Sequence, residues 1–339
     1  MDNKLKINFI NRLLKSKKST DKSEQSKEIN LTPSIQEIPE QLTNKIVTEG
    51  SVYVAGFGGV SVIDVKTNVL KAKIITGGST SDIAITSDKT RIYVAPFEYF
   101  DVSVIDTKSN TVIDAINLTG DSLFGTSSFG IAITPDGESA YLTNDNTILR
   151  INTSTNMITK TVNINEDASG IAITSNGKFA YIAGAKNVFV LDTESNTIVK
   201  TIDIYPSATL ARIVITPDEK LAYITNFDSN ELLVIDLTAN ILLTKIELVN
   251  STTDIAITPD GKFAYCVGAN NLWIIEVSTN IVVNTLEFGE NLWTIAITSD
   301  GRLAYIGDYG NSVYIVDTLS NTLLGKIDVE VEPIRLIII

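Results

Sequence analysis

Residues Ile255–Tyr265 read IAITPDGKFAY: an apolar run, an Asp-Gly pair and a second apolar run that ends in tyrosine. Similar segments recur along the chain, and in each of them the first Ile and the Tyr lie ten residues apart. The other five are Ile83–Tyr93, Ile131–Tyr141, Ile171–Tyr181, Ile213–Tyr223 and Ile295–Tyr305. Successive copies begin 48, 40, 42, 42 and 40 residues apart, a period that indicates repeated supersecondary units.

Each copy continues in register after its tyrosine, and Tyr53 begins a seventh copy whose first part is degenerate or missing. A variable loop leads to an apolar strand that ends in an acid or amide, and an Asn follows four residues later. The acids and amides are Asp64, Asp106, Asn152, Asp192, Asp236, Glu276 and Asp317. The asparagines are Asn68, Asn110, Asn156, Asn196, Asn240, Asn280 and Asn321. We expect the Asn to supply the positive φ of a tight hairpin and the acid to cap that turn.

Four short strands per unit, joined by tight hairpins, predict an antiparallel meander of about 42 residues. Such a sheet is apolar on both faces, and a closed ring of identical sheets buries both faces and leaves no exposed end. The seven tyrosine-marked units therefore predict an all-β fold over residues 46–339, a seven-bladed β-propeller of four-stranded blades.

The last residues of the chain predict how the ring closes. Arg335–Ile339 aligns with the IAIT strand, because Leu336 lies 41 residues after Ile295. We expect this C-terminal strand to be the innermost strand of blade 1, whose other strands come from residues 51–75. The alternative is that Lys45–Thr48 supplies that strand and the C-terminus adds another.

The repeated pattern, IAITPDGK-x-AY-[VIL]-T-N and then V-x-V-I-D-T-x-[ST]-N, resembles the YVTN repeat family of seven-bladed β-propellers and, more distantly, the WD40 pattern. The signature letters survive as Tyr141–Asn144 and Tyr223–Asn226. The resemblance covers roughly residues 46–339 and implies the fold. It also implies kinship with binding scaffolds, surface proteins, lactonases and amine dehydrogenase subunits. The matching residues are turn and core positions, so no catalytic residue carries over.

Composition excludes several kinds of site. The 339 residues carry a net charge of −13, which argues against a nonspecific nucleic-acid binder. Histidine is absent, which removes the usual general base and the commonest zinc ligand. The single cysteine, Cys266, fits a core thiol, and Trp273 fits blade packing. We expect no cofactor, no metal site and no catalytic residue.

The N-terminal 45 residues lie outside the repeat. Residues 1–18 hold six Lys or Arg and one Asp, a local charge of +5 that leaves −18 for the rest of the chain. Their spacing predicts a basic amphipathic helix that lies on an anionic membrane or docks on a partner, and residues 19–45 read as a flexible linker. The alternatives are a helix packed on the propeller or a disordered tail. No secretory signal is recognised, so we expect a cytoplasmic protein, targeted or membrane-associated through this segment.

Aromatic residues mark one predicted face. The second loop of each unit and the blade-to-blade connections share this face, and they vary in length and sequence, as functional loops on a rigid scaffold do. We expect a protein or extended ligand to bind its aromatic residues. They are Phe57, Phe97, Tyr99, Phe100, Phe129, Phe227, Trp293 and Tyr309, with Phe124 and Tyr205 nearby in sequence. The alternative is that these rings only fill gaps between loops.

Charged residues mark the mouth of the central channel. The residues just before the inner strands include Asp82, Arg212, Asp254 and Arg335. The two acids suit either a hard cation or acid–base catalysis. The favoured interpretation is two neutralising ion pairs, because an arginine on the preceding blade stands next to each acid.

Three functions remain open. The leading hypothesis is a non-enzymatic scaffold that binds a protein or extended ligand on the variable loops and is tethered by its N-terminal helix. The alternatives are a lactonase-like hydrolase acting at the channel mouth and a docking subunit for a redox partner.

Overall fold

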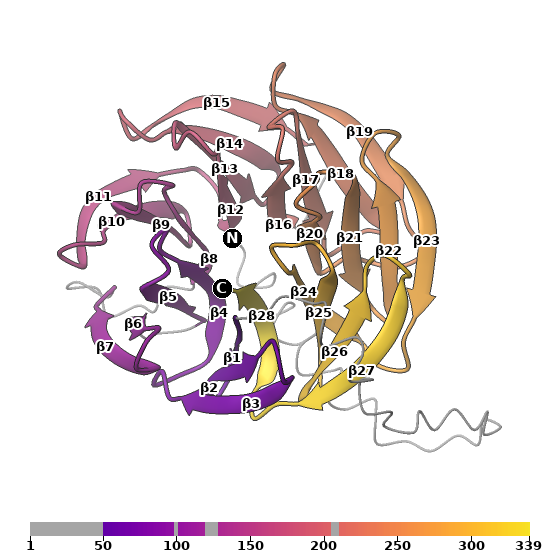
Figure 1. Ribbon diagram of the computed structural model, residues 1–339. Helices are drawn as coiled ribbons and strands as arrows, with labels where there is room; N and C mark the ends of the chain where they lie inside the picture. Colours follow the sequence, from indigo (N-terminus) through magenta and orange to yellow (C-terminus); the bar gives the residue numbers. More distant parts are fainter. Residues whose placement is uncertain (1–49, 98–100, 119–127, 205–209) are drawn as a thin grey trace, which may run out of the picture. The chain divides into compact units, whose positions relative to one another are not determined.

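The computed structural model describes residues 50–97, 101–118, 128–204 and 210–339. The chain divides into two units, Met1–Glu37 and Ile38–Ile339, and every described residue belongs to the second. These residues form seven four-stranded antiparallel sheets in a ring (Figure 1), which confirms the predicted seven-bladed β-propeller. The described part contains no helix, and so none long and apolar enough to cross a membrane. The predicted helix over residues 1–18 and linker over residues 19–45 lie outside the described residues.

Each sheet is one blade, with its strands placed from the centre of the ring to the rim (Figure 1). The innermost strands of blades 1 to 7 are β28 (Glu332–Ile338), β4 (Thr80–Ile85), β8 (Ser128–Ile133), β12 (Ala168–Ile173), β16 (Leu210–Ile215), β20 (Asp254–Ile257) and β24 (Leu292–Ile297). The second strands are β1 (Ser51–Phe57), β5 (Arg91–Pro96), β9 (Ser139–Asn144), β13 (Phe179–Gly184), β17 (Leu221–Asn226), β21 (Phe263–Gly268) and β25 (Leu303–Asp308).

The two remaining strands of each blade lie toward the rim. The third strands are β2 (Gly59–Asp64), β6 (Val102–Asp106), β10 (Thr147–Asn152), β14 (Asn187–Asp192), β18 (Glu231–Asp236), β22 (Asn271–Glu276) and β26 (Ser312–Asp317). The outer strands are β3 (Val69–Ile74), β7 (Thr111–Ile116), β11 (Met157–Asn163), β15 (Thr197–Asp203), β19 (Ile241–Glu247), β23 (Ile281–Glu287) and β27 (Thr322–Asp328).

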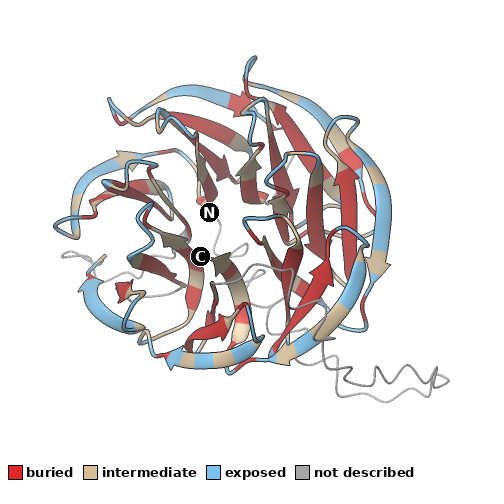
Figure 2. Cartoon of the chain, in the orientation of Figure 1, coloured by how far each residue is buried: buried red, intermediate tan, exposed pale blue. Residues whose placement is uncertain are grey.

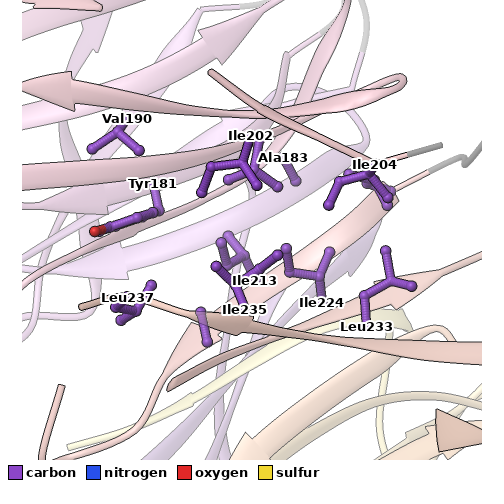
Figure 3. Packing of buried hydrophobic residues seen from close by; sticks show 13 residues of the cluster. Tyr181, Ala183, Val190, Ile202, Ile204, Ile213, Ile224, Leu233, Ile235 and Leu237 are labelled. Carbon is purple, nitrogen blue, oxygen red and sulfur yellow. The ribbon is translucent and has the colours of Figure 1, made fainter. Parts of the chain in front are cut away.

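The core lies between neighbouring blades. Buried residues gather in seven hydrophobic clusters, each formed by two adjacent blades. In the cluster between blades 4 and 5, Tyr181 and Ile202 of blade 4 pack with Ile213 of blade 5 (Figure 3). The rim strands are largely exposed (Figure 2). Because each blade buries both faces against its neighbours, the ring supplies the hydrophobic stabilisation that one sheet lacks.

Two single residues occupy the core as predicted. Cys266 and Trp273 are 0% and 2% exposed and stand opposite each other on β21 and β22. Burial raises the pKa of the Cys266 thiol well above its usual value, which keeps the thiol protonated and unreactive.

The repeated Asn and acid shape the hairpin between the third and fourth strands of every blade. All seven Asn residues have φ between 53° and 57°, so the predicted left-handed turn position is confirmed. The capping role is also confirmed: Asp106 Oδ1, for example, accepts hydrogen bonds from the amide and hydroxyl of Ser109. In the first hairpin, Gly supplies the positive φ in four copies, whereas Lys89 and Glu219 adopt it in two others.

A hydrogen bond between side chains joins each blade to the next. The hydroxyl of each repeated Tyr donates to the Oδ1 of the repeated Asn on the following blade, over 2.6–2.9 Å. The pairs are Tyr53–Asn110, Tyr93–Asn156, Tyr141–Asn196, Tyr181–Asn240, Tyr223–Asn280, Tyr265–Asn321 and Tyr305–Asn68. Burial raises the pKa of Tyr53 and Tyr223 to about 12, so these hydroxyls remain donors at neutral pH.

The C-terminal strand closes the ring, as predicted. Strand β28 pairs with β1, and Val54 stands opposite Leu336. The other edge of β1 pairs with β2. Strand β28 thus occupies the edge that the alternative assigned to Lys45–Thr48, residues that lie outside the described part of the chain.

We expect truncation after Glu332 to remove most of the cooperative stability. The deletion removes nearly all of β28, including Leu336, which is 1% exposed and belongs to the core between blades 7 and 1. Thermal unfolding followed by circular dichroism measures the effect, and deletion of residues 1–45, which the sequence places outside the repeat, is the control. A truncated protein that melts within a few degrees of the full chain would show that β28 does not close the ring.

We expect Tyr305→Phe to lower the free energy of unfolding by about 1–2 kcal/mol, because the partly buried Asn68 loses its donor. Asn68→Gly keeps the left-handed turn accessible but removes the acceptor. A double-mutant cycle on urea unfolding measures the coupling between the two residues. Additive single effects would contradict a stabilising hydrogen bond at the closure.

Candidate functional site

Backbone hydrogen bonds assign the loops to two faces of the ring. Thr193 N donates to Lys178 O over 3.0 Å, which joins the third loop of a blade to the first. Ile204 N donates to Lys186 O over 3.1 Å, which joins the blade-to-blade connection to the second loop. Equivalent bonds recur in other blades. We call the face with the first and third loops the constant face, and the face with the second loops and connections the variable face.

Four of the predicted ligand-binding aromatics occupy equivalent positions on the variable face. Phe57 is the last residue of the second strand of its blade, and Phe97, Phe227 and Tyr309 directly follow the second strands of theirs. All four side chains are half-buried. Blades 3, 4 and 6 carry Asp145, Ala185 and Ala269 at this position. The aromatic surface is therefore uneven around the ring.

The other predicted aromatics divide into two groups. Trp293, half-buried, lies in β24 directly before the channel-mouth position of blade 7. Tyr99, Phe100, Phe124 and Tyr205 lie outside the described residues, and Phe129 lies in β8 without a described side chain. Ligand binding by all these residues stays a prediction.

The structure brings three of the predicted aromatics together in one row. The ring of Trp293 packs edge-to-face against Phe227, with centroids 5.8 Å apart, and against Tyr309, with centroids 5.5 Å apart. Phe227 belongs to blade 5, whereas Trp293 and Tyr309 belong to blade 7. The row therefore crosses blade 6, whose inner strand, β20, has only four residues. We call these three residues the aromatic row.

A buried acid positions one end of the aromatic row. Asp308 is 2% exposed, and its Oδ1 accepts hydrogen bonds from Gly310 N and Ser312 N, both over 2.9 Å. These bonds hold the turn that carries Tyr309. Burial raises the pKa of Asp308 above its usual value, although the two amide donors oppose this shift. Asp308 was not among the functional residues predicted from the sequence, although the other six copies have Gly, Pro or Asn at its position.

The four charged residues predicted at the channel mouth form one network. Arg212 makes a bidentate contact with Asp82: its Nη1 donates to Oδ2 over 2.8 Å and its Nη2 donates to Oδ1 over 2.7 Å. Arg212 Nε lies 3.4 Å from Asp254 Oδ1. Arg335 Nη1 donates to Asp254, and Arg335 Nε lies 3.3 Å from Asp82 Oδ1. The predicted ion pairs are present, but each arginine serves both acids. We call this group the channel quartet.

The acids of the channel quartet also bind the next blade. Asp82 Oδ2 accepts a hydrogen bond from Ile131 N over 2.9 Å. Asp254 Oδ2 accepts hydrogen bonds from Thr294 Oγ1 and Ile295 N over 2.8 and 3.0 Å. Both carboxylates are therefore occupied on both oxygens by donors from the chain, an arrangement that suits an internal clamp.

At the equivalent position in blade 4, Gly170 lets the inner strands of blades 4 and 5 lie close together. A Cβ at this position would lie only 2.6 Å from Ala211 O of blade 5.

Electrostatics favour the charged forms of Asp254 and Arg212 in the channel quartet. Asp82 and Asp254 are each 2% exposed, and burial alone would raise the pKa of Asp254. Arg335, Arg212 and the donors of blade 7 outweigh burial and hold that pKa below its usual value. Burial opposes the charge of Arg212, but its acids raise its pKa. A general acid needs a carboxyl that is protonated near neutral pH, and Asp254 is shifted the other way. The described residues contain no group of three or more Asp, Glu or Cys side chains placed to hold a metal ion.

We expect Asp254→Asn to lower the free energy of unfolding at pH 7 by about 3–5 kcal/mol, because it leaves buried arginine charge uncompensated. The folded state binds a proton at Asp254 less tightly than the unfolded state, so this stability is present above about pH 4 and is lost on further acidification. Urea unfolding at pH 7 and pH 3 measures both effects, and the gap between wild type and variant should narrow at pH 3.

The control for this prediction is Lys262→Gln, which breaks the exposed Lys262–Asp260 pair. That change should cost less than about 1 kcal/mol. A similar small loss in Asp254→Asn would contradict a structural role for the channel quartet.

Comparisons with known proteins support the fold. No family model matches the chain, and no curated protein matches it. A solved protein of unknown function from Desulfotomaculum acetoxidans is similar, with 20% identity, a TM-score of 0.71, and coverage of 86% of this chain and 99% of that one. Kuenenia stuttgartiensis hydrazine synthase has 18% identity, a TM-score of 0.65, and coverage of 76% and 88%.

The dihydro-heme d1 dehydrogenase NirN is also similar, with 15% identity and a TM-score of 0.64. The match covers 85% of this chain but only 65% of NirN. At these identities, all three likenesses show the propeller fold alone.

Proposed function

We propose that this propeller is a non-enzymatic scaffold that binds a protein or extended ligand on its variable face. The observation that carries the proposal is the aromatic row, because three half-buried rings from two blades converge on the face whose loops differ most between copies. Rings of this kind supply large contact areas at low entropic cost in protein interfaces. The row lies on β-strand ends and tight turns, so the scaffold holds it in place before a ligand arrives.

The channel quartet favours the scaffold over the lactonase-like alternative. A hydrolase at the channel mouth needs carboxylate oxygens that are free for a cation or for a substrate proton. The donors of Arg212, Arg335 and the inner strands already occupy Asp82 and Asp254. The alternative of a redox docking subunit follows from the resemblance to amine dehydrogenase subunits. The names of two structural neighbours are compatible with it, but their likeness extends to the fold alone.

Three further parts belong to the proposal. The repeat signature supports membership of the YVTN group of propellers. The basic residues 1–18 support a tether to an anionic membrane or to a partner. We also propose a cytoplasmic location, with residues 1–18 as the segment that targets the protein or associates it with a membrane.

A pull-down with the full chain tests the proposed binding face. We expect Trp293→Ala to weaken the affinity for the captured partner at least about tenfold. A central aromatic anchor contributes about 1.4 kcal/mol or more of binding free energy. The control is Leu319→Ser, which changes an apolar side chain that is 73% exposed in a third loop, on the constant face. Equal capture by both variants would place binding away from the aromatic row.

Deletion of residues 1–18 in the same experiment separates the tether from the binding face. Capture through the aromatic row should survive the deletion, whereas co-sedimentation with anionic liposomes should be lost. Unchanged co-sedimentation would remove the tether from the proposal.

A further inference from the structure

We propose that the aromatic row binds cationic side chains, and that its partner is a protein segment rich in Lys or Arg. The inference rests on the proposed function and names the chemistry of the ligand for that same face. Two independent observations meet here: the geometry of three packed aromatic rings and the charge of the loops around them.

The loops of the variable face in blades 5 to 7 contain acids but no basic residue. They comprise residues 226–230, 248–253, 269–270, 288–293 and 308–311. Asp228 directly follows Phe227, and both Asp228 and Glu290 are exposed. Tyr309 N donates to Asn291 O over 2.8 Å, so the loop that carries Glu290 lies against the turn that carries Tyr309. A cation approaching the aromatic row therefore meets a negative potential.

The background charge acts in the same direction. Residues 19–339 carry −18 in total, since residues 1–18 account for +5 of the overall −13. The arginines of the channel quartet, on β16 and β28, are paired with Asp82 and Asp254. They do not offset the negative potential of the loops.

Aromatic faces attract cations directly. The ring quadrupole places negative charge on the faces, and tryptophan is the strongest of the three ring types. In the aromatic row the rings are tilted by 64° to each other, so neighbouring faces point in different directions. A guanidinium or ammonium group can then contact a ring face among loops that also carry the exposed residues Asp228 and Glu290. Arginine suits this geometry particularly well because its planar group also stacks on rings.

Blades 3, 4 and 6 lack an aromatic residue at the equivalent position. Blades 4 and 6 have Ala185 and Ala269 there, and Lys186 follows Ala185. The inference concerns the three rings of blades 5 and 7 that pack together. The control is Leu319, which is 73% exposed in a third loop on the constant face.

The experiment uses fluorescein-labelled hexa-arginine as the probe, with hexa-glutamate and a Gly-Ser hexapeptide as reference peptides. Fluorescence anisotropy measures the affinity of each peptide for the intact chain and for a chain without residues 1–18, at low and at moderate salt. We expect hexa-arginine alone to bind. Trp293→Leu and Tyr309→Leu, which preserve charge and apolar character, should weaken binding by roughly 2- to 30-fold. Leu319→Ser, on the constant face, should leave binding unchanged.

A second readout uses the unmodified protein. The chain has two tryptophans, and Trp273 is only 2% exposed, so external quenchers report chiefly on Trp293. The ratio of caesium to iodide quenching should exceed the ratio measured for free N-acetyltryptophanamide at equal ionic strength, because the local potential attracts cations and repels anions. Asp228→Asn combined with Glu290→Gln should lower this ratio. A ratio no higher than that of the free reference would overturn the inference even if a row variant failed to fold.

The outcomes separate the inference from the proposed function. If Trp293 controls capture in the pull-down but hexa-arginine binds no better than the Gly-Ser peptide, the partner is not cationic and the scaffold proposal stands. If Trp293→Leu and Leu319→Ser both bind hexa-arginine as well as wild type does, attraction comes from overall acidity and the inference is wrong. If neither capture nor hexa-arginine binding depends on Trp293, both proposals fail.

Discussion

The hydrogen bond from each repeated Tyr to the Asn of the following blade is the constraint on which the ring depends. The Asn has a left-handed backbone, so the same residue shapes its own hairpin and accepts the hydrogen bond from the tyrosine of the neighbouring blade. Because the bond recurs at all seven interfaces, including Tyr305–Asn68 at the closure, every blade takes the same position relative to the next. Hydrophobic burial drives the blades together but has no direction, and this bond supplies one.

The channel quartet shows how position in a fold decides the chemistry of an acid. Asp82 and Asp254 stand on different blades, and each has arginine contacts and a backbone donor of the next inner strand. These contacts favour the charged carboxylate of Asp254 over its protonated form despite burial. The quartet therefore clamps inner strands together. The variable loops, in contrast, differ in sequence from one blade to another.

The aromatic row arises from such differences. The short inner strand of blade 6 lies between blade 5, which supplies Phe227, and blade 7, which supplies Trp293 and Tyr309. Asp308, buried beneath the turn of Tyr309, replaces the Gly, Pro or Asn of the other copies and organises that turn through two amide donors. A repeat scaffold can thus build an irregular site from few substitutions, since neighbouring strands hold the rest of each blade in place.

The sequence by itself determined the number of blades, the closure by Arg335–Ile339, the left-handed Asn turns and the two faces, because these features repeat at a fixed period and depend on local backbone chemistry. It also brought Asp82, Arg212, Asp254 and Arg335 to one place, since a ring aligns equivalent positions. Only the tertiary structure decided that each arginine serves both acids, that Tyr bonds to Asn, and that Phe227 and Trp293 meet across blade 6. The Tyr–Asn bonds join residues 55 to 237 positions apart, and the Arg212–Asp82 and Phe227–Trp293 contacts join non-adjacent blades. Contacts between side chains across a closed ring leave no periodic pattern in the sequence.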